Sequence, residues 1–187
     1  MIRKPMFRDE VANLLHATYG NPFRTCIQCG LCSATCPVVR FMDHSPREII
    51  AMIFADLKEK ILKSNTFWYC ASCYHCAVRC PRDIPIADMM YALKRYSMWT
   101  HQYPEDVIGP AFSERFVKAI LKTGKSFEPA LAPVFVFKYG FWGFLLDART
   151  AAKLLRKGRL PLIPSKIRRR GDFRRMVGKI IPLAGVE

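Results

Sequence analysis

The sequence contains the same pattern of four cysteines and a proline twice. In both copies the cysteines are separated by two, two and three residues, and a proline follows the last one. The first cysteine run is Cys26, Cys29, Cys32 and Cys36, and the second, 44 residues later, is Cys70, Cys73, Cys76 and Cys80. Closely spaced thiolates on one loop can wrap a face of a cubane cluster, whose four irons each need one thiolate. The pattern therefore predicts two [4Fe–4S] clusters as cofactors.

The spacing also predicts which cysteines share a cluster. In the two-cluster ferredoxin arrangement, the fourth cysteine of each run binds the cluster of the other run. The first cluster is then held by Cys26, Cys29, Cys32 and Cys80, and the second by Cys70, Cys73, Cys76 and Cys36. Structural zinc is the alternative use of Cys-x2-Cys pairs, but zinc ribbons need two pairs, whereas runs of four that end in Cys-Pro are the ferredoxin signature.

The sequence gives no sign of a substrate site. It contains no Gly-rich dinucleotide fingerprint, no phosphate-binding loop and no constellation of nucleophile and base. We therefore expect no catalytic residue and no small-molecule substrate for this chain. Its expected role is electron transfer, with catalysis on a partner protein.

Helical patterns dominate the sequence, and no segment alternates at period two for long enough to predict a strand. The mainly α prediction comprises an N-terminal helix within residues 1–20, an all-helical two-cluster ferredoxin domain at 21–100, and a helical, basic subunit-docking extension at 101–187. The interval between Cys36 and Cys70 holds a helix that starts with the capping box Ser45-Pro46-Arg47-Glu48. This interval favours the all-helical domain over the small α+β ferredoxin. The other helices are expected on Phe7, Val11, Leu14 and Leu15 with a stop at Gly20, from about Ile86 to Trp99, over 112–123 closed by Gly124, and over 144–157 closed by Gly158.

The charge of the chain is strongly positive and concentrated in the C-terminal third. The formal net charge is +15, and residues 149–179 contain twelve Lys or Arg and one acid, Asp172. Such a surface fits an acidic protein, an anionic lipid or a nucleic acid. No nucleic-acid recognition motif accompanies the basic residues, so we expect no nucleic-acid partner. The apolar stretch 129–148 is interrupted by Lys138, Asp147, glycines and prolines, which indicates a docking surface and not a membrane span.

The beginning of the sequence bears on the redox compartment. Residues 1–5 lead into Arg8, Asp9 and Glu10 without the apolar stretch that a signal peptide needs. We therefore expect a reducing cytoplasm, where eight cysteines serve metal binding better than disulfides.

Several segments resemble the C-type iron–sulfur subunit of heterodisulfide reductase and its relatives. They are residues 25–33, the helix that begins at Ser45, residues 69–73 and residues 80–84. The sequence has no Cys-Cys-Gly motif, which in this family belongs to the catalytic B-type subunit. The resemblance implies a protein that relays electrons between a flavin-bearing A-type subunit and the B-type subunit, which in methanogens reduces the mixed disulfide of coenzymes M and B. Segments 124–129 and 157–161 look more like the related proteins of sulfur-oxidising and sulfate-reducing organisms.

The basic tail and the apolar stretch 129–148 leave a second function open. The chain would then be the iron–sulfur adaptor of a membrane-associated, quinone-linked oxidoreductase, with a peripheral membrane contact through the tail. Each basic group near an anionic bilayer contributes about 1 kcal/mol to such binding.

Overall fold

The structure is a computed structural model that describes residues 6–15, 22–131, 133–134, 152–159 and 163–180. The chain divides into two compact units, Met1–Val107 and Ile108–Glu187. Helices and 3₁₀ turns are the regular elements of the described residues, and no strand occurs among them. The prediction of a mainly α fold is therefore confirmed. None of the helices in the described part of the chain is both long enough and apolar enough to cross a membrane.

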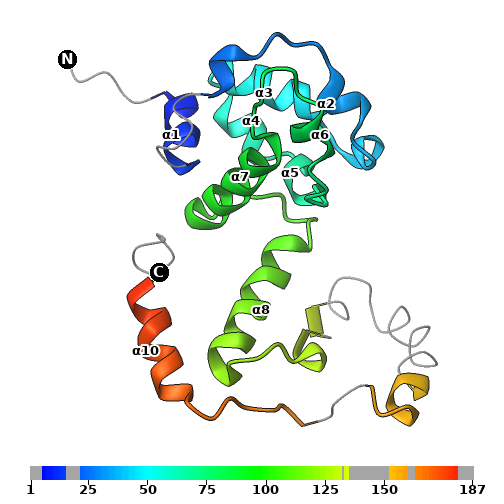
Figure 1. Ribbon diagram of the computed structural model, residues 1–187, viewed down its shortest axis with the longest axis vertical. Coiled ribbons are helices and arrows are strands. Elements are labelled where there is room, and N and C mark those ends of the chain that lie inside the picture. Colours follow the sequence, from blue (N-terminus) through cyan, green and yellow to red (C-terminus); the bar gives the residue numbers. More distant parts are fainter. Residues whose placement is uncertain (1–5, 16–21, 132, 135–151, 160–162, 181–187) are drawn as a thin grey trace. The chain divides into compact units, whose positions relative to one another are not determined.

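The first unit is built from two longer helices that hold several short ones (Figure 1). The longer helices are α3 (Pro46–Phe54) and α7 (Ile86–Thr100). Helix α2 packs on α3 and α6, α5 and α6 pack on α7, and α1 packs on both α3 and α7. Two longer helices thus support the short helices that follow the cysteine loops. The remaining elements are α1 (Phe7–Leu14), η1 (Pro22–Thr25), α2 (Leu31–Ala34), η2 (Val39–Phe41), α4 (Lys58–Leu62), α5 (Thr66–Tyr69) and α6 (His75–Val78).

Helix α3 begins at the predicted capping box. The Ser45 hydroxyl accepts a hydrogen bond from the Glu48 backbone N–H, and the Glu48 carboxylate accepts one from the Ser45 N–H at 2.7 Å. Pro46 occupies the first helical position, where a missing N–H costs nothing. The hydrogen bond from the Ser45 N–H also lowers the pKa of Glu48. Because Ile49, Ile50 and Ile53 follow at helical spacing, the helix buries one apolar face.

Helix α7 supplies the other half of the core. It starts at Ile86, directly after Pro85, and its Met89 and Leu93 side chains are fully buried. Phe67 on α5 is also fully buried against this core. The predicted start of this helix is confirmed, because proline can stand before the first turn but not inside it.

Polar and aromatic contacts fix α1 to the rest of the first unit. The Phe7 backbone N–H donates to Asp56 Oδ1 at 2.6 Å, which satisfies a free group at the helix N-terminus. Lys58 Nζ lies 3.0 Å from Glu10 Oε2, and the Tyr96 hydroxyl donates to the same oxygen at 2.7 Å. The Phe7 and Tyr96 rings meet edge to face at 5.4 Å. The helix ends at Leu14, and the predicted stop at Gly20 lies outside the described residues.

The second unit contains α8 (Gly109–Thr123), η3 (Glu128–Leu131), a helical segment at 152–156 and α10 (Arg170–Ile180). Helix α8 begins ahead of the predicted residue 112, because Pro110 fits in its first turn. It ends before Gly124, which has φ +79°, as predicted. Of the helix expected over 144–157, residues 144–151 lie outside the described residues, as does most of the apolar stretch 129–148.

Candidate metal centre

The two cysteine loops share an unusual backbone conformation. Gln28 and Ser72, 44 residues apart, have φ values of +57° and +54°. Gly30 and Tyr74, also 44 residues apart, have φ values of +83° and +60° and precede α2 and α6. Left-handed residues that alternate with ordinary ones turn backbone N–H groups into a concavity that suits anions, including iron–sulfur clusters. The sequence repeat is therefore also a structural repeat.

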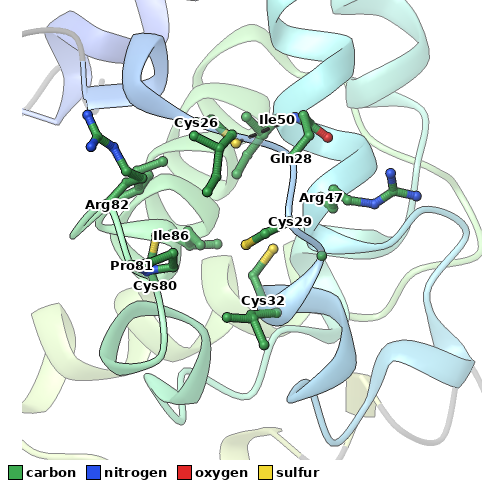
Figure 2. Close-up of a pocket in the computed structure, with 14 residues that line it drawn as sticks. Cys26, Gln28, Cys29, Cys32, Arg47, Ile50, Cys80, Pro81, Arg82 and Ile86 are labelled. Carbon is green, nitrogen blue, oxygen red and sulfur yellow. Dashed lines mark hydrogen bonds between the residues drawn. The ribbon is translucent and has the colours of Figure 1, made fainter.

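The first pocket collects three cysteines of the first run and the last cysteine of the second. Its thiol-bearing residues are Cys26, Cys29, Cys32 and Cys80 (Figure 2). Cys26 follows η1, Cys32 lies on α2, and Cys80 comes shortly after α6. The Gln28 side-chain amide donates to Cys26 Sγ at 3.5 Å. This pocket therefore brings together residues that are more than 50 positions apart in the sequence.

A hydrogen bond from a side chain to the backbone joins the two runs at the first pocket. Arg82 Nε donates to the Thr25 carbonyl oxygen at 3.2 Å, across 57 residues of sequence. Thr25 directly precedes the first cysteine, and Arg82 follows the Cys80-Pro81 pair. This hydrogen bond holds the end of the second run beside the start of the first.

The second pocket has the reverse composition. It is lined by Cys70, Cys73 and Cys76 of the second run and by Cys36 of the first, together with the apolar side chains of Val38, Met42, Ala87 and Met90. Lys94 Nζ donates to the Cys70 carbonyl oxygen at 3.1 Å and fixes the start of this loop to α7. The structure thus gathers all eight cysteines in two groups of four.

Helices α3 and α7 line both pockets with successive residues. On α3, Pro46 lines the second pocket and Arg47 the first. On α7, Ile86 lines the first pocket and Ala87 the second. The two pockets therefore share two helical walls, so the distance between them is set by the packing of the core.

The electrostatics of the thiols follow this grouping. Burial raises the pKa of Cys32. Burial, with the neighbouring charges of Cys70 and Cys73, also raises the pKa of Cys36. Burial and the same two neighbours raise the pKa of Cys76 to about 11. Metals bind thiolates and not thiols, so bound cations must offset the free-energy cost of deprotonating these cysteines. Metal binding therefore releases protons.

The donor set of each pocket fits a [4Fe–4S] cluster, which takes four cysteine thiolates. Within the described ranges, no three His, Cys, Asp or Glu side chains converge closely enough to hold a single metal ion. A cubane presents its irons at separate corners, with one thiolate for each, so its ligands need not converge on one point. Cys29 and Cys73, at equivalent positions of the two loops, are exposed, and Cys32 is buried.

The sequence identifies the cysteines but not the residues that shape their loops. The left-handed backbone of Gln28, Ser72 and Tyr74 has no signature in these residue types. The one available signal is the 44-residue offset, which aligns Tyr74 with Gly30.

Among the aromatic residues near the second run, Phe67 is buried in the core, whereas Tyr74 is 43% exposed and donates a hydrogen bond to Asp88.

Comparison with known protein families identifies a domain within the first unit. Residues 22–84 match the family model of the 4Fe-4S dicluster domain, which includes both cysteine runs. The first unit therefore contains a 4Fe–4S dicluster domain, and iron–sulfur clusters are its cofactors.

Individual relatives are more specific. The chain is 36% identical over 90 residues to the C-type subunit of the H2:CoB-CoM heterodisulfide,ferredoxin reductase of Methanothermobacter marburgensis. The matched region covers 48% of this chain and 49% of that protein. The chain is 31% identical over 94 residues to the C-type iron-sulfur subunit of the CoB–CoM heterodisulfide reductase of Methanopyrus kandleri, with the same coverage. The C-type subunit of a ferredoxin:CoB-CoM heterodisulfide reductase of Methanosarcina acetivorans is 38% identical over 73 residues, or 39% of this chain and 29% of that protein. The chain spans about half the length, or less, of these curated relatives. The predicted resemblance to the C-type subunit of heterodisulfide reductase is confirmed.

Proposed function

We propose that this chain is the electron-relay component of a cytoplasmic complex that resembles heterodisulfide reductase. Its partners would be a flavoprotein similar to the A-type subunit and a catalytic protein similar to the B-type subunit, and the complex would act in sulfur or disulfide redox metabolism. Cys26, Cys29, Cys32 and Cys80 would hold one [4Fe–4S] cluster, and Cys70, Cys73, Cys76 and Cys36 the other. Bound clusters would supply one-electron carriers, and the chain itself would contribute no catalytic residue.

One observation carries the proposal: each pocket combines three cysteines of one run with the fourth cysteine of the other. This sharing forces the two sites to lie next to each other on the common walls of α3 and α7. Neighbouring sites suit transfer of electrons across the protein, because transfer needs proximity and no acid–base group.

The test is an anaerobic preparation of the full chain with analysis of iron, sulfide and electron paramagnetic resonance spectra. We expect about eight irons and eight sulfides for each chain, as two [4Fe–4S] clusters require. A colourless protein that holds zinc would contradict the proposal.

The pairing of ligands has its own test. Cys36→Ser should alter the signal of the cluster bound by the second run and leave that of the first run unchanged, and Cys80→Ser should do the reverse. Damage to the first-run cluster in Cys36→Ser would refute the shared arrangement while leaving the cofactor itself in place.

Helix α10 supports the second candidate, a membrane-associated adaptor linked to a quinone. Phe173 and Val177 are half-buried and Met176 is 57% exposed, at the spacing of one helical face. Arg174 and Arg175 are exposed between them. A short helix with an apolar face and basic neighbours can lie in the headgroup region of an anionic bilayer.

Flotation with liposomes of anionic and of neutral phospholipid separates the two candidates. The relay within a cytoplasmic complex predicts that the isolated complex stays with the protein fraction in both cases. Salt-sensitive flotation with the anionic liposomes alone would favour the membrane-associated adaptor.

A further inference from the structure

The rim of the first pocket exposes apolar side chains beside a thiol. Ile27 and Leu31 both line this pocket, and their side chains are 63% and 44% exposed. Cys29, which lies between them in the sequence, is itself exposed. Exposed apolar residues around a redox site are a typical centre for a protein interface.

Two arginines flank these residues. Arg47 and Arg82 line the first pocket from opposite sides, and Figure 2 shows both guanidinium groups directed away from the thiols. Both side chains are exposed, and neither forms an ion pair with another described residue. The hydrogen bond from Arg82 Nε to the Thr25 carbonyl holds that guanidinium group at the rim. No carboxylate is among the described residues that line the pocket.

The second pocket differs in charge. None of the described residues that line it is Asp, Glu, Lys or Arg, and the polar group at its rim is Tyr74, whose hydroxyl donates to Asp88 at 2.9 Å. The two sites therefore offer different surfaces to a partner, one cationic and one neutral.

We propose that the rim of the first pocket, made of Ile27, Leu31, Arg47 and Arg82, is the docking surface for an acidic redox protein. The partner's docking face has an apolar centre and carboxylates placed to meet the two guanidinium groups. Arginine forms paired hydrogen bonds with carboxylates, and opposite charges on two surfaces raise the rate of association. This inference rests on the proposed function, because it assigns one end of the relay to a partner of defined charge.

Stopped-flow kinetics with the cluster-loaded full chain test this surface. The probe is a reduced, acidic plant-type [2Fe–2S] ferredoxin, whose low potential makes it a suitable electron donor. The test variant is Arg47→Glu with Arg82→Glu. The matched control is Lys60→Glu with Lys63→Glu, which changes the net charge equally at exposed residues that line a different cavity of the same unit.

At low ionic strength, the rim variant should lower the second-order rate constant for electron transfer from the ferredoxin about tenfold or more. This loss should become smaller as the salt concentration rises. The control variant should stay within about twofold of the unmodified chain. Equal rates for the rim variant and the unmodified chain would refute the proposal that this rim is a docking surface. An equal loss of rate in the control variant would refute it as well.

Iron content separates this inference from the proposed function. An unmodified chain without about eight irons would refute the proposed function and the docking surface together. An unmodified chain with full iron but an unaffected rim variant would refute the docking surface alone. If charge reversal reduces the iron content, Arg47→Gln with Arg82→Gln provides the same comparison, with about half the effect on the logarithm of the rate constant expected because it removes half the charge.

Discussion

Replacing Gly30 with alanine measures the cost of the left-handed turn between Cys29 and α2. Gly30 has φ +83°, and a Cβ atom there would have Arg47 Cδ as its nearest neighbour at 3.8 Å, an ordinary contact. The substitution therefore changes the backbone energy and not the packing. A non-glycine residue in this conformation costs about 1–2 kcal/mol. That cost lowers the ratio of folded to unfolded protein by about 5- to 30-fold.

Thermal unfolding of the cluster-loaded protein, followed by circular dichroism under anaerobic conditions, measures this cost. For a unit of this size, each kcal/mol should lower Tm by about 4–8 °C. Gly178→Ala on α10 is the control, because a Cβ there meets no atom of the described residues within 4 Å and φ is not positive. Alanine inside a helix should stabilise α10 by about 0.5–1 kcal/mol. An unchanged Tm for Gly30→Ala would refute the argument that this loop requires the left-handed turn.

Other perturbations test the core and the charged contacts. Ser45→Ala removes the cap of α3 and should cost about 1 kcal/mol in urea unfolding. Since the pKa of Glu48 is lowered in the folded state, its contribution is present above its ordinary value of 4.5 and is lost as the pH falls; Glu48→Gln should flatten the stability curve in acid. Phe67→Ala should cost about 3–5 kcal/mol, because this ring is fully buried, and a cost below about 1 kcal/mol would contradict its place in the core. Burial alone would lower the pKa of Lys58, but the hydrogen bonds of Lys58 to Tyr96 and to the Glu10 carboxylate outweigh this effect and raise that pKa. Burial also raises the pKa of Tyr96. Both groups stabilise the fold when the pH is below their ordinary pKa values of 10.5 and 10.0, and this contribution is lost as the pH rises through the raised pKa values. Tm should therefore fall at alkaline pH, and it should fall less in Tyr96→Phe.

Features that depend on short-range chemistry can be predicted from residue types and their spacing alone. The repeated spacing of the cysteines predicts the donors of two clusters, with the fourth cysteine of each run assigned to the cluster of the other run. The capping box at Ser45 marks a helix start, because its side chains form hydrogen bonds with free backbone N–H groups. Gly124 marks a helix end, because glycine readily adopts the left-handed conformation found there. The mainly α fold follows from the same local signals.

Features that depend on residues far apart in the sequence arise only from the packing of the folded chain. The first pocket gains Arg47 from α3 and Arg82 from beyond the second run, so its cationic rim exists only once these segments pack together. Gln28 and Tyr74 adopt left-handed conformations that their own propensities disfavour, which requires the surrounding fold to hold them. Local propensity sets which segments become helices, but only long-range packing sets which side chains meet, because contacts across many residues are gained only when the whole core forms.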